Sequence, residues 1–269
     1  MISSVSVYGV AHQDDWQLFM DPNISADLTN PHCKTIVVHV TAGDGGEDEK
    51  YWKARERAAV SSLVFRLSNG PPPAVGEQYV RLLDKSIYCV RAGNCALYFL
   101  RLPDGGMKGN GFGRYAHAST ARLREGGISG ITSVDGLNTY HHFDELTALV
   151  DALLDREVAE SGMARAGSLR MNLPEVDPVL NPNDHNDHLN TALLFQRTGR
   201  YASAEKYAFV HYDIQYAGSD LQGEALFWKA GMFSVYHQAV LDLHGHSTLG
   251  ESPEYGVWAV KKAKFRKIS

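Results

Sequence analysis

The sequence has few cysteines, and they form no recognisable framework. Only Cys33, Cys89 and Cys95 occur among 269 residues, and none belongs to a C-x-x-C pair. This pattern disfavours a disulfide scaffold, a cysteine zinc site and a dithiol redox centre, and it is typical of a reducing compartment. We therefore expect a cytoplasmic, soluble enzyme or binding protein.

Excess positive charge and long apolar runs are also missing. The formal net charge is -5, which gives no support for binding to nucleic acid or to an anionic membrane. The N-terminus has no basic region and its apolar run is short, so we expect no signal peptide and no transmembrane segment. The basic stretch at residues 261–267 is predicted to be a solvated end.

Two apolar runs rich in β-branched residues each lead through a polar turn into a helical pattern. Strands are predicted at residues 5–10 and 35–40, and helices at 16–20 and 47–67. This alternation is typical of a doubly wound α/β layer with a mostly parallel sheet. With 44% hydrophobic residues the chain can form one substantial core, so we expect a single domain over residues 1–269.

The pattern changes at about residues 70–136, which we interpret as a β and loop excursion inserted in the domain. Short strands are predicted at 78–83, 86–91 and 96–102. Residues 103–136 contain nine glycines and read as a long loop, either a lid or a surface loop with no role. Helices are then predicted at 139–161, 191–199 and 221–244, with strands within 167–180 and at 209–216.

Two polar clusters each follow a β-rich segment. The first is A-H-Q-D-D at residues 11–15, and the second is H-N-D-H at residues 185–188. Catalytic zinc typically takes three protein ligands and keeps one position open, and both clusters offer ligands three residues apart. If both lie at the carboxyl edge of the sheet, they supply what metal-assisted hydrolysis needs. Either motif alone is common, and a histidine at a strand end is more often a hydrogen-bonded polar residue.

The two clusters together resemble the signature pair of the PIG-L/LmbE-like zinc-dependent N-deacetylases. Further stretches match in order: T-A-G-D-G-G at 41–46, Y-W-K-A-R-E at 51–56, L-R-L-P-D-G at 100–105 and, more loosely, 229–238. The resemblance implies a Rossmann-like fold. It also implies zinc-dependent removal of an N-acyl group, acetyl above all, from the N-acylglucosamine unit of a glycolipid, thiol glycoside or glycopeptide. The expected partner is thus a small molecule or glycoconjugate, and a homo-oligomer is compatible with it.

The resemblance also implies roles for individual residues. His12, Asp15 and His188 would be the zinc ligands, although Fe(II) or Co(II) suits the same ligands. Asp14 would be the general base, and His185 would stabilise the oxyanion or protonate the leaving amine. Asp187 would orient a ligand imidazole. These assignments follow from the match of the two motifs and not from their spacing alone.

Three further residues are candidates for substrate contact. Arg55 or Lys53 would touch the substrate, although a surface salt bridge explains them equally well. The chain has Gln13 where the family commonly has Pro, and Trp16 where it has Glu. Trp16 would either line the pocket or pack in the core.

Three other functions compete with an N-acylglucosamine deacetylase. The first is an esterase or a deacetylase of a non-sugar amine at the same metal site. The second is a non-catalytic binding protein of the same fold. A dinucleotide-binding protein is disfavoured, because no G-x-G-x-x-G follows the first strand.

Overall fold

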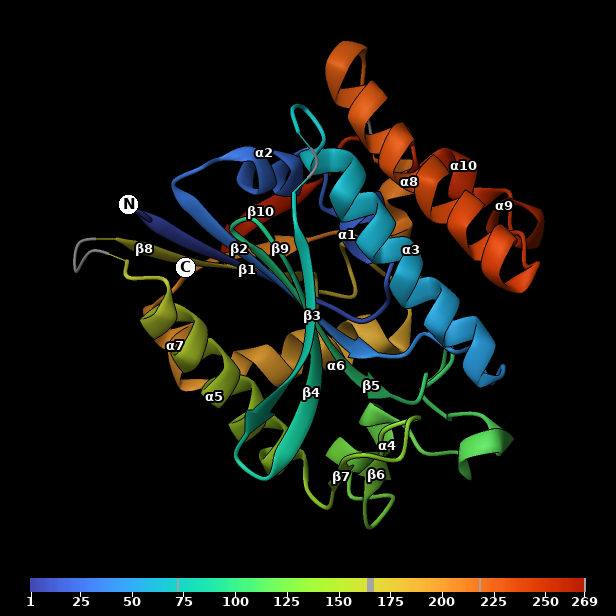
Figure 1. Cartoon of the computed structure of the whole chain (residues 1–269). Coiled ribbons are helices and arrows are strands. Elements are labelled where there is room, and N and C mark those ends of the chain that lie inside the picture. The colour runs from blue at the N-terminus through green and yellow to red at the C-terminus, as the bar shows by residue number, and fades with distance from the viewer. Residues whose placement is uncertain (72, 164–166, 218, 269) are drawn as a thin grey trace.

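The computed structural model describes residues 1–71, 73–163, 167–217 and 219–268. Its centre is one eight-stranded sheet in the order β10-β9-β8-β1-β2-β5-β4-β3, beside a separate pair β6-β7 (Figure 1). The strands are β1 (Ser4–Val10), β2 (Cys33–Thr41), β3 (Val75–Leu82), β4 (Lys85–Ala92), β5 (Cys95–Leu102), β6 (Ile131–Thr132), β7 (Thr139–Tyr140), β8 (Ser168–Pro174), β9 (Glu205–Phe209) and β10 (Phe265–Ile268).

The middle of the sheet is parallel and covered on both faces. β1 pairs in parallel with β2 and β8, β2 with β5, and β8 with β9. Val5 and Val7 belong to the apolar cluster on one face, whereas Tyr8 and Val10 belong to the cluster on the other. Two buried faces account for the near-continuous apolar runs of β1 and β2. The predicted α/β fold is confirmed.

The helices form two layers. One face carries α5 (Phe143–Glu160), α6 (Asn186–Gln196) and α7 (Gly199–Ser203). The other carries α1 (Asp15–Phe19), α2 (Asn23–Thr29), α3 (Glu49–Leu67), α8 (Gly223–His244) and α10 (Glu254–Trp258), with α9 (Thr248–Glu251) beside α8. Helices α3 and α8 lie along each other over much of their length (Figure 1). No helix among the described residues is long and apolar enough to cross a membrane.

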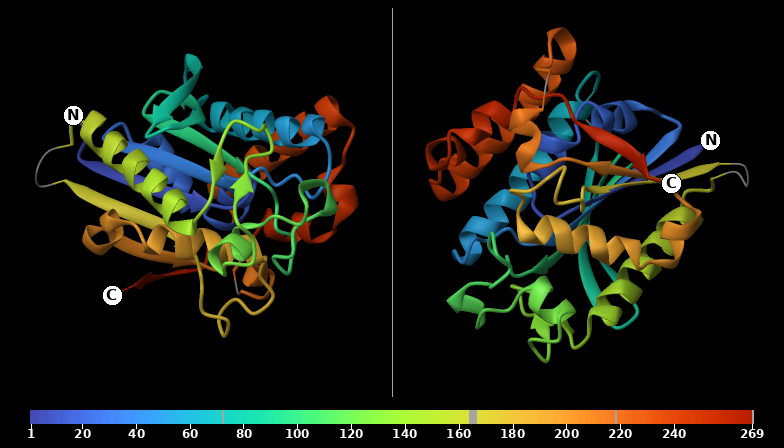
Figure 2. Two further views of the ribbon diagram at one scale, coloured as in Figure 1. Left: turned by 90° about the horizontal axis from the view of Figure 1, so that it is seen from below. Right: turned by 180° about the vertical axis from the view of Figure 1, so that it is seen from behind.

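The strand order reverses between β1 and β8. From β1 the chain moves outward to β2 and β5, and it later places β8 and β9 on the opposite side of β1. In open α/β sheets, ligands bind in the crevice outside the carboxyl ends of the strands at such a switch point. Both chain termini lie at the other end of the sheet (Figure 2). The loops after β1, β2, β5 and β8 therefore meet at one candidate site.

The predicted excursion is less separate than expected. β5 joins the parallel sheet beside β2, and β4 and β3 extend that sheet as antiparallel strands. The predicted loop at 103–136 contains a 3-10 turn η1 (Gly113–Tyr115), the helix α4 (Thr120–Arg124) and strand β6. These short elements lie beside the carboxyl ends of the strands (Figure 1).

The C-terminal half differs from the prediction in several places. Helix α6 begins at Asn186 rather than 191, because His185 caps it by accepting a hydrogen bond from the Asp187 N–H. Strand β9 ends at Phe209, and Tyr212–Tyr216 forms a 3-10 helix instead of continuing the strand. The basic stretch 261–267 is not simply a solvated end, because β10 pairs antiparallel with β9 and supplies an edge strand.

Candidate metal centre

The two predicted polar clusters meet at the carboxyl edge of the sheet. His12 and Asp15 follow β1, and His188 lies in the first turn of α6, which follows β8. Asp15 Oδ1 lies 3.5 Å from His12 Nδ1 and 3.1 Å from His188 Nε2. All three side chains are buried. The parallel pairing of β1 with β8 is what brings residues 173 positions apart in the chain to one point.

These three side chains fit a divalent ion. Bonds of 2.0–2.1 Å in a tetrahedral site place neighbouring ligand atoms about 3.3–3.4 Å apart, close to both measured distances. Two imidazoles and a carboxylate are a donor set that suits zinc. The assignment of His12, Asp15 and His188 as ligands stays a prediction, but their geometry and chemistry agree with it.

Neighbouring groups hold these side chains in place. Asp15 Oδ2 accepts the backbone N–H groups of Ala11 and His12, at 3.0 and 2.8 Å, which leaves Oδ1 directed at the imidazoles. His188 Nδ1 contacts Asp184 Oδ1 at 2.7 Å, an arrangement that directs Nε2 into the site. Burial lowers the pKa of His188, but Asp15 and Asp184 outweigh it and raise the pKa to about 9. The surroundings thus favour positive charge at this position.

Asp14 is held by a buried arginine from α3. Arg55 Nη2 donates to Asp14 Oδ1 at 2.6 Å, and Arg55 Nε donates to the Tyr236 hydroxyl at 2.7 Å. Asp14 Oδ2 is buried and has no hydrogen-bond partner. The T-A-G-D-G-G turn makes room for this arginine, because a Cβ on Gly43 would lie 2.5 Å from Arg55 Nη1. One oxygen of Asp14 is therefore fixed, and the other is available to accept a proton.

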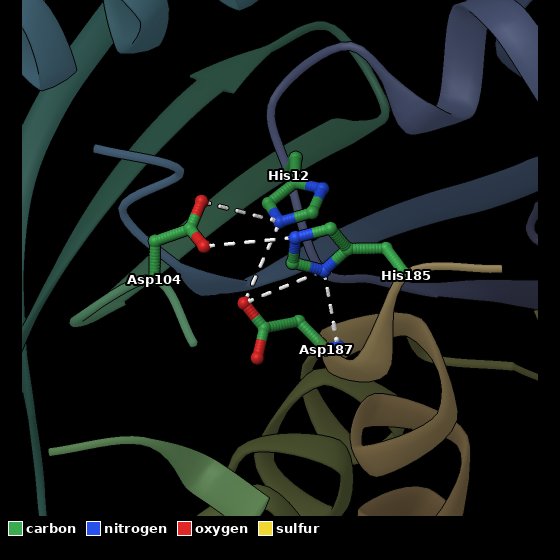
Figure 3. A group of neighbouring side chains, drawn as sticks. All are labelled: His12, Asp104, His185 and Asp187. Atoms are coloured by element: carbon green, nitrogen blue, oxygen red, sulfur yellow. Dashed lines mark hydrogen bonds and ion pairs between the residues drawn. The ribbon is translucent and has the colours of Figure 1, made fainter. Parts of the chain in front are cut away.

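A second group of side chains faces Nε2 of the His12 ring (Figure 3). His12 Nε2 is 3.6 Å from both Asp104 Oδ2 and Asp187 Oδ2, and His185 Nε2 is 3.7 Å from Asp104 Oδ1. Burial and the neighbouring His12 lower the pKa of His185 to about 4. Because His185 Nδ1 accepts the Asp187 N–H, the neutral ring carries its proton on Nε2, which faces Asp104.

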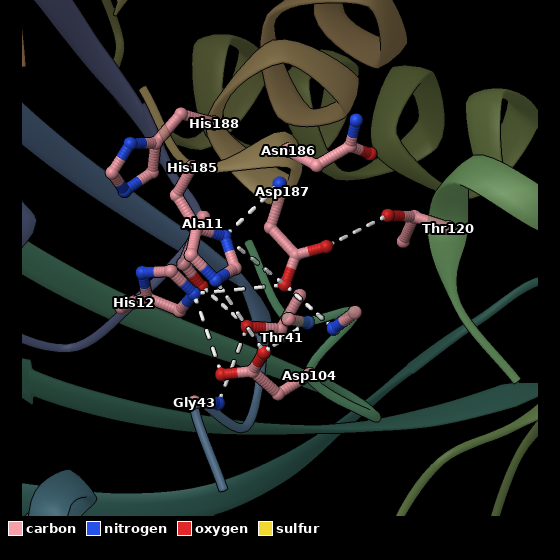
Figure 4. A network of polar contacts seen from close by, with 12 residues as sticks. Ala11, His12, Thr41, Gly43, Asp104, Thr120, His185, Asn186, Asp187 and His188 are labelled. Carbon is pink, nitrogen blue, oxygen red and sulfur yellow. Dashed lines mark hydrogen bonds and ion pairs between the residues drawn. The ribbon is translucent and has the colours of Figure 1, made fainter. Parts of the chain in front are cut away.

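Asp187 lies beside His12, one of the expected ligand imidazoles, and not beside His188. Its Oδ2 accepts the Gly105 N–H at 2.8 Å and lies near His12 and His185, while Oδ1 contacts Thr120 (Figure 4). The carboxylate that contacts the second ring nitrogen of His188 is Asp184 instead. Asp187 thus lies where it can orient His12, whereas Asp184 orients His188.

The sequence analysis assigned no role to Asp104. It follows β5 in the L-R-L-P-D-G stretch and reaches the same edge of the sheet because β5 is parallel to β2. The available signal was a polar residue two positions after the predicted strand at 96–102. A register shift between His39 and Thr41, opposite the end of β5, and an Arg101 φ of 59° alter the path of the chain just before Asp104.

A cavity of about 250 Å³ connects these groups. Its polar side is formed by His12, Asp14, Asp15, Arg55, Asp104 and His185, and its other walls by Leu18, Phe19, Gly43, Gly45, Tyr51, Gly106, Met107, Phe112, Tyr212, Tyr255 and Trp258. The aromatic wall was not predicted, since no sequence motif links Tyr212 or Trp258 to the site. The 103–136 segment contributes part of the lining, as expected of a binding loop.

Of the three candidate substrate contacts, only Arg55 lines this cavity. Lys53 forms an exposed ion pair with Glu49 on the surface of α3, which agrees with the alternative of a salt bridge. Trp16 is fully buried in the apolar cluster under α1 and does not reach the cavity. Of the two expected alternatives, Trp16 therefore packs in the core and does not line the pocket.

Comparisons with known proteins extend only to the fold. No family model matches the chain, and no curated protein matches it. The chain is similar to the crystal structure of a deacetylase triple mutant from the teicoplanin biosynthetic pathway, with a TM-score of 0.51 and 9% identity over 98% of this chain and 96% of that one. It is also similar to the zinc-inhibited form of teicoplanin deacetylase (TM-score 0.48, 11% identity, 97% and 96% covered). A third similar structure is the 4-carboxy-2-hydroxymuconate hydratase from Pseudomonas putida KT2440 (TM-score 0.46, 11% identity, 100% and 97% covered).

The fold and the site together define a doubly wound α/β protein with a candidate His/Asp metal centre at its switch point. More specifically, the chain shares the fold of a teicoplanin-pathway deacetylase over nearly its whole length. The Rossmann-like fold implied by the resemblance to the PIG-L/LmbE-like deacetylases is confirmed.

Proposed function

We propose that this chain is a metal-dependent hydrolase that removes an N-acyl group, acetyl in the first instance, from an N-acylglucosamine-type unit of a larger conjugate. The supporting observation is the joint geometry of the site. Asp15 Oδ1 lies 3.5 Å from His12 Nδ1 and 3.1 Å from His188 Nε2, and Asp14, with one oxygen unpartnered, lines the cavity beside His12 and Asp15. The fold shared with a deacetylase agrees with this proposal.

The chemistry divides among the side chains as follows. A zinc ion bound by His12, Asp15 and His188 would acidify water and polarise the amide carbonyl. Asp14 accepts the proton of the attacking water through Oδ2, while Arg55 fixes Oδ1. His185 Nε2–H faces the cavity and donates a hydrogen bond to the developing oxyanion. Water adds to the carbonyl carbon, the C–N bond breaks, and the nitrogen takes up the proton that Asp14 accepted from water, giving an amine and a carboxylate.

The cavity suits an amino sugar attached to a larger group. The aromatic side chains Tyr212, Tyr255 and Trp258 offer flat apolar surfaces, and such surfaces pack against the C–H faces of sugar rings. Asp104 and Arg55 supply charged groups for hydroxyl recognition on the other side. At about 250 Å³ the cavity encloses one small unit, so the carrier of the sugar would extend into solvent. A cytoplasmic location is part of the proposal and agrees with the three unpaired, buried cysteines.

Acyl release from a panel of N-acylglucosamine conjugates, measured together with bound metal, tests this proposal. Asp14→Asn should retain zinc and lose about 10²–10⁴-fold in kcat, because a positioned general base contributes that much. His188→Ala should lose the primary zinc ion as well as turnover. Asp84→Asn, an exposed carboxylate in the β3–β4 turn, is the matched control and should change neither.

The same panel decides between the proposal and its rivals. Turnover of esters or of non-sugar amides, with the N-acylglucosamine conjugates inert, would establish the esterase or non-sugar deacetylase. Binding of a conjugate with no turnover of any panel member would establish the non-catalytic protein. A fully active Asp14→Asn variant would refute the role given to Asp14.

A further inference from the structure

The His12 ring has two nitrogens that face two different sets of ligands. Nδ1 faces Asp15 in the candidate zinc site, 3.5 Å away. Nε2 points the opposite way, toward Asp104 and Asp187, and has no hydrogen-bond partner although the side chain is only 5% exposed. An unpartnered polar atom in such a buried position normally indicates a missing partner, since most buried polar groups are hydrogen-bonded.

Four side chains surround the space that Nε2 faces. His12, Asp104, His185 and Asp187 can each offer one ligand atom, and these atoms all lie within 4.8 Å of one another. All four residues are buried, and Figure 3 shows them directed at a common point. His12 and Asp104 come from the loops after β1 and β5, and His185 and Asp187 from the N-terminal end of α6, which follows β8, so the sheet itself brings them together.

The spacing within this group differs from that of a hydrogen-bonded network. His12 Nε2 lies 3.6 Å from Asp104 Oδ2 and from Asp187 Oδ2, and His185 Nε2 lies 3.7 Å from Asp104 Oδ1. Such distances are too long for hydrogen bonds. They are slightly longer than the separation of about 3.3–3.4 Å between ligands of a tetrahedral zinc ion.

We propose that His12, Asp104, His185 and Asp187 form a second divalent-cation site beside the primary one. Two carboxylates carry the charge that a divalent cation needs, and two imidazoles favour zinc over calcium or magnesium. The ligands must be deprotonated, so binding there releases protons and weakens as the pH falls. The site is weaker than the primary one, because His12 is shared and must lose its ring proton to bind two ions.

Occupancy of this site has a consequence for activity, which rests on the proposed function. An ion bound to His185 Nε2 removes the N–H group that would face the substrate. Excess zinc should therefore inhibit the hydrolase, whereas the first equivalent should activate it. The structure assigns the inhibition to Asp104 and His185 and not to the primary ligands.

Zinc stoichiometry is the direct test and needs no substrate. The full chain is dialysed against a series of buffered free Zn²⁺ concentrations, and bound zinc is measured by elemental analysis. The wild type should bind two ions in separate steps. Asp104→Asn and His185→Asn should each retain the first ion and weaken the second at least about 10-fold. Asparagine at 185 remains a good N-cap for α6, so this variant should fold.

The primary-site variant separates this proposal from the proposed function. His188→Ala should bind one ion, at the second site, and His188→Ala combined with Asp104→Asn should bind that ion at least about 10-fold more weakly. Asp84→Asn controls for surface carboxylates and should bind two. A wild type that binds only one ion, or a second ion unaffected by Asp104→Asn and His185→Asn, would overturn the second site. Two ions bound as predicted, but no acyl release at any zinc concentration, would leave the second site standing and refute the proposed function.

Discussion

Two buried polar clusters lie at opposite ends of the sheet and differ in how completely their charges are paired. Toward the amino end, Glu157 of α5 is surrounded by donors: Lys34 Nζ lies 2.6 Å from Oε2, the Tyr98 hydroxyl lies 2.5 Å from Oε1, and Arg91 also donates to it. One carboxylate thus receives three donors, two of them cationic. Nothing in this cluster lacks a partner among the described contacts.

The cluster at the carboxyl end is the opposite case. Five carboxylates lie around the imidazoles, those of Asp14, Asp15, Asp104, Asp184 and Asp187. Arg55 is the only arginine or lysine among the residues that line the cavity there. His12 Nε2 and Asp14 Oδ2 have no hydrogen-bond partner. The raised pKa values of His12 and His188 mean that these imidazoles offset part of the negative charge, but the two unpartnered atoms remain, and such groups persist mainly where function requires them. The comparison separates a cluster that stabilises the fold from one suited to binding cations and substrate.

The largest expected effect on stability is at the amino-end cluster. Glu157→Gln leaves the buried Lys34 without its counter-charge and removes the nearer of the two carboxylates paired with Arg91, and breaking a buried pair in this way costs about 3–5 kcal/mol. Urea unfolding at pH 7 measures the loss. Asp155→Asn, on the same helix but 60% exposed and outside this cluster, is the matched control and should change the unfolding free energy by less than about 0.5 kcal/mol. A loss below about 1 kcal/mol for Glu157→Gln would remove the distinction between the clusters.

This variant should also change the response to acid. Burial raises the pKa of Glu157, but hydrogen bonds from Arg91, Lys34 and Tyr98 outweigh it and hold the pKa below its usual value. The ion pairs therefore contribute stability above the unfolded pKa of about 4.3, and this contribution is lost as the pH falls through the folded pKa. Glu157→Gln should lose less stability than the wild type in that acid range.

The second prediction concerns Asp44, a buried carboxyl group beside the carboxyl-end cluster that accepts the Asp104 N–H. Burial and the nearby Asp104 carboxylate raise its pKa to about 6. A raised pKa contributes stability that is complete below the unfolded pKa of about 3.9 and is lost as the pH rises through 6. The loss amounts to about 3 kcal/mol for a shift of this size. Metal-free wild type and Asp44→Asn should therefore differ in the pH dependence of their unfolding free energies between pH 4 and 8. If the unfolding free energies of the two proteins changed with pH in parallel, the pKa of Asp44 would not be raised in the folded chain.

Much of the site was predictable because strands with polar turns share one edge in a parallel sheet. The pairing of β1 with β8 was enough to bring His12, Asp15 and His188 together. The sequence could not distinguish Asp184 from Asp187, since which of two nearby carboxylates reaches an imidazole depends on where α6 begins. It also could not choose between Lys53 and Arg55. These lie two positions apart on α3, so they point to different sides of the helix, and only one could face the cavity.

The aromatic wall was beyond prediction for another reason. Tyr212 and Trp258 stack with ring centroids 4.6 Å apart, but they are 46 positions apart in the chain. Their position depends on how α8, α10 and the 3-10 helix after β9 pack against α1. No local sequence pattern in those segments indicates how they pack against one another. The contrast with His12 and His188 shows that sheet topology can be inferred from sequence more readily than the packing of terminal helices.

The smallest expected change in unfolding free energy is that of Asp104→Asn, and it tests whether the two clusters differ in their contribution to stability. Asp104→Asn removes one of the five carboxylates of the carboxyl-end cluster. Asparagine keeps an oxygen that can accept the Gly106 N–H, which Asp104 Oδ1 now accepts at 2.7 Å. Metal-free Asp104→Asn should therefore equal the wild type in unfolding free energy at pH 7, or exceed it by up to about 1 kcal/mol, because like charges in partly buried positions repel by roughly this amount. With saturating zinc the order should reverse, since the wild type gains stability from a second bound ion and the variant does not. Urea unfolding with a chelator and with zinc, on both proteins, measures the two differences. A metal-free loss above about 1 kcal/mol would mean that Asp104 stabilises the fold as Glu157 does, and that the two clusters are not of different kinds.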